Sequence, residues 1–300
     1  MLRGLLLCFF IVLPISTAKA ELLWSQSFES QALGAPLRFS IYLPPGYHDP
    51  RDDSQALRYP VVYLLPGVGD NERAYPAFAR VEAMADRMIS DGDIPPMILV
   101  MPNGATSWYV DSSDVGGPGN YATAIRTDLI RYIDQSYRTI ADRSGRYVTG
   151  HSMGGFGALR LAFERPDLFG GTAAMSSALW SRVTEDFVLP EGAKRIFQSS
   201  FGDPFDPIRF LELRPRGMVD ELKTVTAEHG LHLPIYLSAG DDDQFRAYRS
   251  TFELAMELRE ADLDVELRIL QGGHTWELWR ERALPDVLQW FSSLIEAYKV

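Results

Sequence analysis

Cysteine is almost absent from this chain of 300 residues, and basic side chains are outnumbered, with 29 Lys and Arg against 40 Asp and Glu. The one cysteine, Cys8, lies in an N-terminal segment that we expect to be removed, which excludes disulfides, cysteine catalysis and thiolate metal sites from the mature protein. The net charge of −11 repels phosphate backbones and anionic lipid headgroups, and no basic cluster offsets it. The composition therefore argues against nucleic-acid binding and is typical of a soluble protein.

Long apolar runs are also missing, with one exception at the N-terminus. Arg3, the apolar run LLLCFFIVLPIS and the small-residue site Ala18-Lys19-Ala20 are typical of a signal peptide. The apolar run is too short to span a bilayer comfortably, so we expect no stable membrane anchor. We predict a signal peptide at 1–20, one domain at 21–300, and a secreted or periplasmic location.

Short apolar runs rich in β-forming residues alternate with longer amphipathic stretches along the rest of the chain. This alternation predicts an α/β fold with a mostly parallel central sheet flanked by helices. The predicted strands lie at 37–43, 61–65, 97–101, 147–150, 171–175, 234–239 and 265–270, and the predicted helices at 74–90, 121–137, 153–164, 245–260 and 276–297. Residues 177–231 break the alternation with Pro, Gly and charged side chains. We expect a small helical insertion there, a candidate lid over the carboxyl ends of the strands, where such sheets bind ligands.

The segment Gly150-His151-Ser152-Met153-Gly154 fits the pattern G-x-S-x-G between a predicted strand and a predicted helix. A serine on such a sharp turn projects its hydroxyl away from the backbone, and the two glycines remove side chains that would collide there. The alternative is an ordinary glycine-rich turn between a strand and a helix. The context favours a catalytic nucleophile at Ser152.

A serine hydroxyl needs a base within hydrogen-bond reach, and the chain offers five histidines. His274 follows a predicted strand through Gln271-Gly272-Gly273 and precedes a helix, which places it at the carboxyl edge of the sheet. His151 adjoins the serine but points the other way across the turn, so we expect it to pack or to support the site. The remaining three lie in a loop or in the insertion: His48, His229 and His232. We predict His274 as the general base.

The acid that orients the base is expected in Asp241-Asp242-Asp243, which follows the strand at 234–239. The order Ser, Asp, His along the chain is the order of the triad in α/β-hydrolases. Position alone leaves all three aspartates open, and at least one of them is expected to cap the helix that follows.

The developing oxyanion needs two backbone donors. The amide of Met153 directly follows the nucleophile at the start of a helix, whose dipole favours negative charge there. A second amide is expected from the loop Pro66-Gly67-Val68-Gly69, and we select Val68. No metal or organic cofactor is expected.

Four sequence blocks spread over nearly the whole mature chain resemble a known family. They read VVYLLPGVGDNERAY, DRSGRYVTGHSMGGFGALRLAFERPDLF, SAGDDDQF and GGHTW. The chain is similar to the family of esterases that includes esterase D, bacterial feruloyl esterases and secreted mycolyltransferases, and the resemblance implies an α/β-hydrolase fold. It further implies Asp243 as the acid, with Val68 and Met153 as the oxyanion donors.

The chain departs from many relatives at two positions. Pro66-Gly67 stands where they have His-Gly, and Tyr121-Ala122-Thr123 stands where they have Tyr-Glu-Thr. The formylglutathione hydrolases of this family carry a cysteine near the oxyanion loop, so the lack of a mature cysteine argues against that subfamily.

Aromatic side chains are candidates for a substrate pocket, although packing is the alternative for each. The four candidates are Trp108, Tyr109, Trp180 and Trp276.

Together these residues predict a serine esterase that acts on a small-molecule, polysaccharide or lipid ester through an acyl-enzyme intermediate. An acyltransferase with a sugar or lipid alcohol as acceptor would use the same triad. A third possibility is a binding protein that has the hydrolase fold but no activity.

Overall fold

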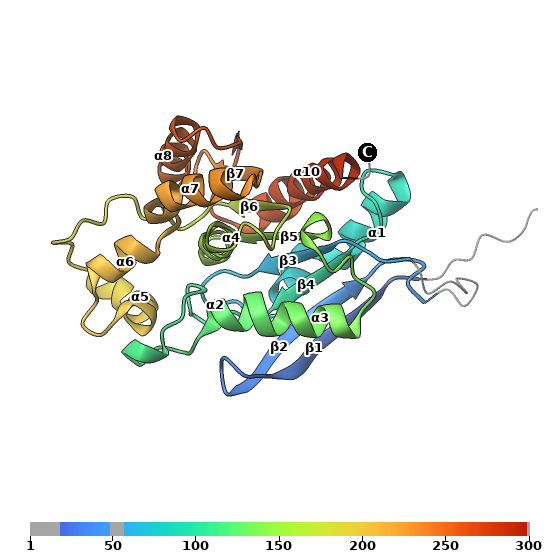
Figure 1. The fold of residues 1–300 in the computed structure, drawn as a ribbon, viewed down its shortest axis with the longest axis horizontal. Helices are drawn as coiled ribbons and strands as arrows, with labels where there is room; N and C mark the ends of the chain where they lie inside the picture. Colours follow the sequence, from blue (N-terminus) through green and yellow to red (C-terminus); the bar gives the residue numbers. More distant parts are fainter. Residues whose placement is uncertain (1–18, 49–56, 299–300) are drawn as a thin grey trace, which may run out of the picture.

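The computed structural model describes residues 19–48 and 57–298, and its centre is one eight-stranded sheet with helices on both faces (Figure 1). The strands are β1 Glu21–Ser30, β2 Ala35–Leu43, β3 Val61–Leu65, β4 Ile98–Pro102, β5 Arg146–His151, β6 Gly171–Met175, β7 Ile235–Gly240 and β8 Val265–Leu270. Their order in the sheet is β1-β2-β4-β3-β5-β6-β7-β8. β2 runs antiparallel to β1 and β4, and all other neighbours are parallel. The predicted mostly parallel α/β fold is confirmed.

The helices connect the parallel strands and also build the segment between β6 and β7. The α-helices are α1 Val81–Asp91, α2 Tyr121–Thr123, α3 Ile130–Ser136, α4 Met153–Glu164, α5 Lys194–Phe201, α6 Pro207–Leu213, α7 Val219–His229, α8 Ala247–Glu260, α9 Trp276–Leu278 and α10 Leu284–Ala297. The π-helical turns are η1 Tyr75–Ala79, η3 Ala124–Leu129 and η7 Trp279–Ala283, and the 3-10 turns are η2 Ser113–Val115, η4 Arg143–Gly145, η5 Glu191–Ala193 and η6 Pro215–Met218.

Each face of the sheet carries its own hydrophobic layer. Val61, Tyr63 and Leu65 of β3 belong to the layer that includes α3 and α4. Val62 and Leu64 belong to the layer beneath α1 and α10. Successive side chains of a strand point to opposite faces, so a strand covered on both sides is apolar throughout. This explains why the central strands read as uninterrupted apolar runs.

The sequence missed β1 and predicted three helices as continuous. β1 is an edge strand whose residues are, except for Ser30, exposed or half-buried, and its pairing with β2 shifts between Leu23 and Gln26, so it lacks an apolar run. The predicted helix at 74–90 is broken at Arg80, which has a left-handed backbone (φ 49°) between η1 and α1. The predicted helices at 121–137 and 276–297 contain the π-helical turns η3 and η7.

The predicted helical insertion at 177–231 is confirmed, with α5, α6 and α7 as its main elements. α5 and α6 lie together at one end of the molecule, away from the β1–β2 hairpin (Figure 1). Their packing is aromatic, and the fully buried side chains of Phe197, Phe201 and Phe210 form its centre. Trp108, from the loop after β4, stacks on Phe197 at 4.5 Å between ring centroids and so joins the insertion to the main domain.

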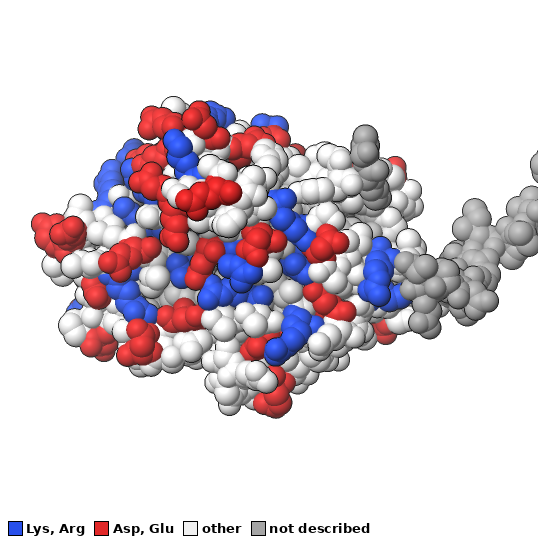
Figure 2. All heavy atoms as spheres, in the orientation of Figure 1, with Lys and Arg blue, Asp and Glu red and all other residues white. Residues whose placement is uncertain are grey.

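Charged side chains of both signs are interspersed on the face drawn in Figure 2. Within the described ranges, no helix has the length and apolarity needed to cross a membrane. The same ranges contain no group of three or more His, Cys, Asp or Glu side chains arranged to hold a metal ion. Apart from Lys19 and Ala20, the predicted signal peptide at 1–20 lies outside the described residues.

Candidate active site

Ser152 occupies the turn between β5 and α4, with φ 54° and ψ −118°. This backbone conformation is rare for any residue with a side chain and is found mainly where surrounding structure enforces it. Two hydrogen bonds hold the turn: the Ser152 N–H donates to the Met175 carbonyl at 3.0 Å, and the Ala178 N–H donates to the Ser152 carbonyl at 3.1 Å. The end of β6 thus fixes the serine beside the insertion.

The two glycines of the pentapeptide sit where a side chain would collide with backbone. A Cβ on Gly154 would lie 1.8 Å from the Leu65 carbonyl oxygen at the end of β3. A Cβ on Gly150 would lie 2.4 Å from the Gly154 carbonyl carbon. The predicted reason for these glycines is confirmed, because α4 begins in contact with the end of the neighbouring strand.

His274 and Asp243 meet at the carboxyl edge of the sheet, in the loops after β8 and β7. His274 Nδ1 lies 2.7 Å from Asp243 Oδ2, and the Asp243 side chain is completely buried. The other carboxylate oxygen accepts the Phe245 N–H at 2.8 Å. Because the buried carboxylate faces Nδ1, the imidazole tautomer with a proton on Nδ1 is favoured and Nε2 is left to act as a base.

Ser152 and His274 line one cavity of about 830 Å³, which the insertion and α8 also border. The His274 ring packs between Phe245, at 4.9 Å, and Trp279, at 5.0 Å between ring centroids. Only 11% of the His274 side chain is exposed, and that part lies at the cavity. The fold therefore places the predicted histidine in contact with the predicted aspartate and on the same cavity as the predicted serine.

Of the two residues predicted as oxyanion donors, Met153 directly follows Ser152 and Val68 lines the same cavity. Met153 is the first residue of α4, where a helix leaves its N–H without an intrahelical acceptor. Val68 follows β3 in a loop that also lines the cavity, and 37% of the residue is exposed. The preceding amide, Gly67 N–H, donates to His151 Nε2 at 3.2 Å.

His151 supports this loop from beneath. Its Nε2 also lies 3.1 Å from Asp70 Oδ2, and its Nδ1 lies 3.1 Å from the Tyr75 hydroxyl. The ring is buried against Trp276 and Trp279, and this burial lowers the pKa of His151 below its ordinary value. The predicted supporting role thus has a specific geometry, in which His151 Nε2 faces both the Gly67 N–H and the Asp70 carboxylate.

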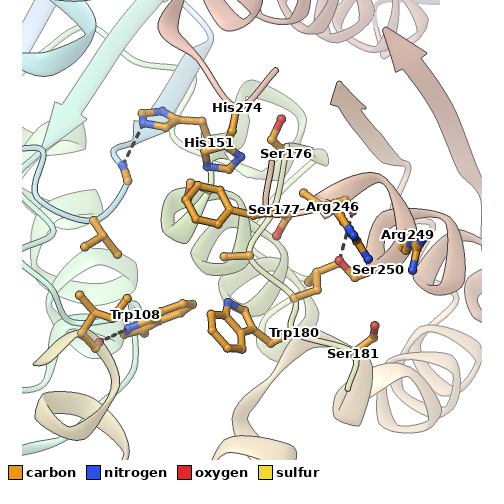
Figure 3. A pocket seen from close by; sticks show the side chains of 18 of the residues that line it. Trp108, His151, Ser176, Ser177, Trp180, Ser181, Arg246, Arg249, Ser250 and His274 are labelled. Carbon is orange, nitrogen blue, oxygen red and sulfur yellow. Dashed lines mark hydrogen bonds between the residues drawn. The ribbon is translucent and has the colours of Figure 1, made fainter. Parts of the chain in front are cut away.

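The four aromatic candidates have different positions. Trp108, Trp180 and Trp276 line the cavity, the first two in the lower part of the view in Figure 3. Tyr109 does not line it, so the prediction of a substrate contact is wrong for this residue. Its ring is fully buried, its hydroxyl donates to the Pro66 carbonyl at 2.9 Å, and the ring occupies the space that a Cβ on Gly157 would need.

Cavity residues that the sequence analysis missed include Arg182, Arg246 and Arg249. The first follows β6, and the other two stand at the start of α8. A signal was present in the sequence: two arginines begin a helix directly after the candidate acid, where acidic residues are more usual.

Comparison with known proteins gives matches over most of the chain. Residues 30–291 match the protein family described as "Putative esterase". An endo-1,4-beta-xylanase/feruloyl esterase of Xylanibacter ruminicola is 32% identical over 186 residues, which cover 60% of this chain and 24% of that protein. An esterase of Mycobacterium tuberculosis is 34% identical over 157 residues, covering 52% of this chain and 31% of that protein. The chain thus spans less than a third of either relative.

Among solved structures, that of a ferulic acid esterase superposes with a TM-score of 0.74 at 23% identity. The superposition covers 92% of this chain and 99% of the other. A likeness at this level of identity establishes a shared α/β-hydrolase fold.

Proposed function

The chain belongs to the "Putative esterase" family, and from this premise we propose that it is a serine carboxylic-ester hydrolase with Ser152 as nucleophile, His274 as general base and Asp243 as the acid that orients the base. The main support is the 2.7 Å contact between His274 Nδ1 and Asp243 Oδ2, at a cavity that also contains Ser152. These three residues, far apart in sequence, are the nucleophile, base and acid that acyl transfer requires.

In the first step, Ser152 Oγ attacks the ester carbonyl carbon while His274 Nε2 takes the hydroxyl proton. The buried Asp243 carboxylate stabilises the imidazolium that forms. The negative charge that develops on the carbonyl oxygen is stabilised by the N–H groups of Val68 and Met153. His274 then gives its proton to the leaving alcohol, and the acyl group remains bound to Ser152.

In the second step, water attacks the acyl-enzyme while His274 again acts as the base. The bond to Ser152 breaks, its Oγ recovers a proton from His274, and the acid leaves. His151 holds the Gly67 amide in place, which keeps the next amide of the loop, Val68, aimed at the oxyanion throughout both steps.

The direct test replaces Ser152 with Ala and measures hydrolysis of small aryl esters together with labelling by a fluorophosphonate. We expect both to be lost, with kcat reduced about 10⁶-fold, because the nucleophile is missing. Ser293→Ala, at an exposed serine on α10, is the matched control and should label like the wild type. Retention of labelling and hydrolysis in Ser152→Ala would refute the proposal. An added sugar alcohol that receives the acyl group would identify an acyltransferase instead.

We also propose that the protein is exported and that its signal peptide is cleaved after Ala20. The support is the signal-like sequence and the start of β1 at Glu21, directly after the predicted cleavage site. Mass spectrometry of protein recovered from the periplasm or the medium should give an N-terminus at Glu21. An intact N-terminus on protein recovered from the cytoplasm would contradict this.

A further inference from the structure

Three arginines line the active-site cavity of a chain whose net charge is −11. Arg182, Arg246 and Arg249 all line the cavity, together with Ser250 of α8. In Figure 3, Arg246, Arg249 and Ser250 lie side by side on one side of the cavity, apart from the pair of histidines at the top. Among the described residues that line the cavity, Asp70 is the one carboxylate, and it lies 3.1 Å from His151 Nε2.

Within the described ranges, none of these three guanidinium groups forms an ion pair. Arg249 has one aromatic neighbour, the Tyr248 ring, whose centroid is 6.0 Å away. The nearest acid along α8 at helical spacing, Glu253, binds Arg216 Nη1 at 3.3 Å and is thereby occupied. The charge of the cluster is thus not neutralised by the protein itself.

The position of Arg246 and Arg249 on α8 is unfavourable for the helix in three respects. Arg246 is the N-cap, has a left-handed backbone (φ 57°) and makes no side-chain capping hydrogen bond. The first turn contains no acidic residue, although the N-terminal end of a helix dipole favours negative charge and disfavours cations. Residues three apart on a helix are neighbours, so the two arginines also repel each other. All three arginines are exposed to solvent. The arrangement does not favour α8 itself, and an anionic ligand in the cavity would offset these unfavourable contacts.

A second, independent feature of the same cavity points to a polar ligand. Ser177 lines the cavity and is 1% exposed, and its Oγ has no hydrogen-bond partner. Buried hydroxyls are nearly always hydrogen-bonded, so an unpaired one that lines a cavity is free to donate to an acceptor on a bound molecule.

The arginines are linked to the catalytic groups through one turn. Asp243 accepts the Phe245 N–H through its side chain and the Arg246 N–H through its carbonyl, both at 2.8 Å. Phe245 contacts the His274 ring. The turn that holds Asp243 therefore also positions Arg246, which lines the same cavity as Ser152.

We propose that Arg182, Arg246 and Arg249 form an anion subsite, so that the substrates are esters that carry a carboxylate away from the scissile bond. This inference rests on the proposed esterase function and specifies its substrate class. The planar guanidinium group forms paired hydrogen bonds with a carboxylate, which suits it to this role.

The test compares matched esters with and without a carboxylate. For the alcohol side, the pair is 4-acetoxybenzoate and its methyl ester; for the acyl side, it is mono-4-nitrophenyl succinate and 4-nitrophenyl butyrate. The quantity measured is the ratio of kcat/KM for the charged ester to that for its neutral partner. When this ratio is compared between the wild type and a variant, differences in the intrinsic reactivity of the esters cancel. Any general loss of activity in the variant cancels as well. The pair that responds identifies which part of the substrate carries the charge.

We expect the double variant Arg246→Gln/Arg249→Gln to lower the ratio about tenfold or more for one pair, because charge-assisted hydrogen bonds are lost. Arg246→Lys should retain an intermediate ratio, since it keeps the charge and loses the planar fork. Arg259→Gln is the matched control: it removes the same charge from the last turn of α8, outside the cavity, and should leave the ratio unchanged.

A binding measurement separates this proposal from the proposed function. Calorimetry with Ser152→Ala should show tighter binding of the charged ester than of its neutral partner, and the preference should disappear when Arg246 and Arg249 are also replaced by Gln. Failure of the wild type to hydrolyse any of the four esters would count against the esterase, and binding would still decide the subsite. Equal ratios and equal binding preferences with and without the arginines would overturn the subsite.

Discussion

The loops after β3, β5, β7 and β8, here called the catalytic rim, and the insertion at 177–231 border the same cavity but are held in place differently. Main-chain hydrogen bonds fix the rim: the Asp241 N–H donates to the Leu270 carbonyl at 2.8 Å, and the Asp242 N–H donates to the Gly272 carbonyl at 3.0 Å. Aromatic side chains hold the insertion, centred on Phe197 and Trp108.

This difference indicates that the catalytic rim and the insertion contribute differently to activity. Backbone contacts at the end of a sheet hold the reacting groups in fixed positions, which the reaction requires. The close packing there leaves no room for an added atom. A side-chain cluster over the cavity shapes the wall and can change without moving the reacting groups. Changes in the rim should therefore act on kcat, and changes in the insertion should act on KM and local stability.

The largest effect is expected from Asp243→Asn in the rim. The amide cannot stabilise an imidazolium or hold the required tautomer of His274, so kcat should fall about 10⁴-fold with the fold intact. Steady-state kinetics on a small aryl ester measures this. Asp241→Asn is the control, because Asp241 is exposed and its carboxylate accepts the Gly272 N–H and, among the described residues, has no contact with His274. Equal losses in both variants would show that the acid has been misidentified.

A methyl group added in each region tests the comparison more directly. Gly154→Ala would force the start of α4 away from the Leu65 carbonyl, only 1.8 Å from the new Cβ. We expect a loss of about 3 kcal/mol in unfolding free energy and at least about a hundredfold in kcat, since the oxyanion loop follows β3.

Gly192→Ala, in the insertion, meets no atom within 4 Å of the new Cβ. Urea unfolding and kinetics should both match the wild type. A strong effect at Gly192, or a weak one at Gly154, would remove the proposed distinction between a packed rim and a tolerant insertion.

Phe197→Ala should disturb the insertion while sparing the chemistry. Phe197 is fully buried and stacks on Trp108, so removing its ring should cost about 3–5 kcal/mol of stability, mainly in the insertion. Loosening this wall should raise KM for bulky esters and leave kcat for a small ester nearly unchanged. A fall in kcat with unchanged KM would instead place the insertion in the chemical step.

The smallest effect is expected on the pH dependence of stability, through the buried His151 ring beneath the catalytic rim. Burial lowers the pKa of His151 below 6.5, so the unfolded chain takes up a proton near that pH which the native protein excludes. Native stability therefore falls as pH drops below about 6.5, by up to about 1.4 kcal/mol per pH unit from this group. His151→Gln should show a shallower decline in urea unfolding between pH 7 and pH 5. Equal slopes would mean that the buried ring does not control acid stability.

Some features follow from the sequence because they depend on local patterns. The β3, β6 and β8 bounds agree with the predicted ranges, and α4 begins directly after the serine. Parallel strands end at one edge of a sheet, so residues that follow strands, such as Ser152 and His274, are expected to share a cavity. The local strand-turn-helix pattern and this topological rule sufficed to place both of them.

Tertiary structure decided what depends on contacts between distant segments. The sequence left three aspartates open, the family resemblance pointed to Asp243, and the packing of β7 beside β8 brings its side chain to His274. The sequence predicted Tyr109 as a pocket residue. Its ring is instead buried against Gly157, in the space that a Cβ at that position would fill.

The sequence by itself thus determined seven of the eight strands, the serine turn and the edge of the sheet at which the proposed catalytic groups stand, because hydrophobic periodicity and glycine placement act over a few residues. Only the tertiary structure decided which carboxylate meets the histidine, which aromatic rings face the cavity, and which arginines remain without a counter-ion. The reason is physical: burial and charge pairing are set by neighbours in space, many of them more than thirty residues away in the chain, such as Asp243 and His274 at a separation of 31.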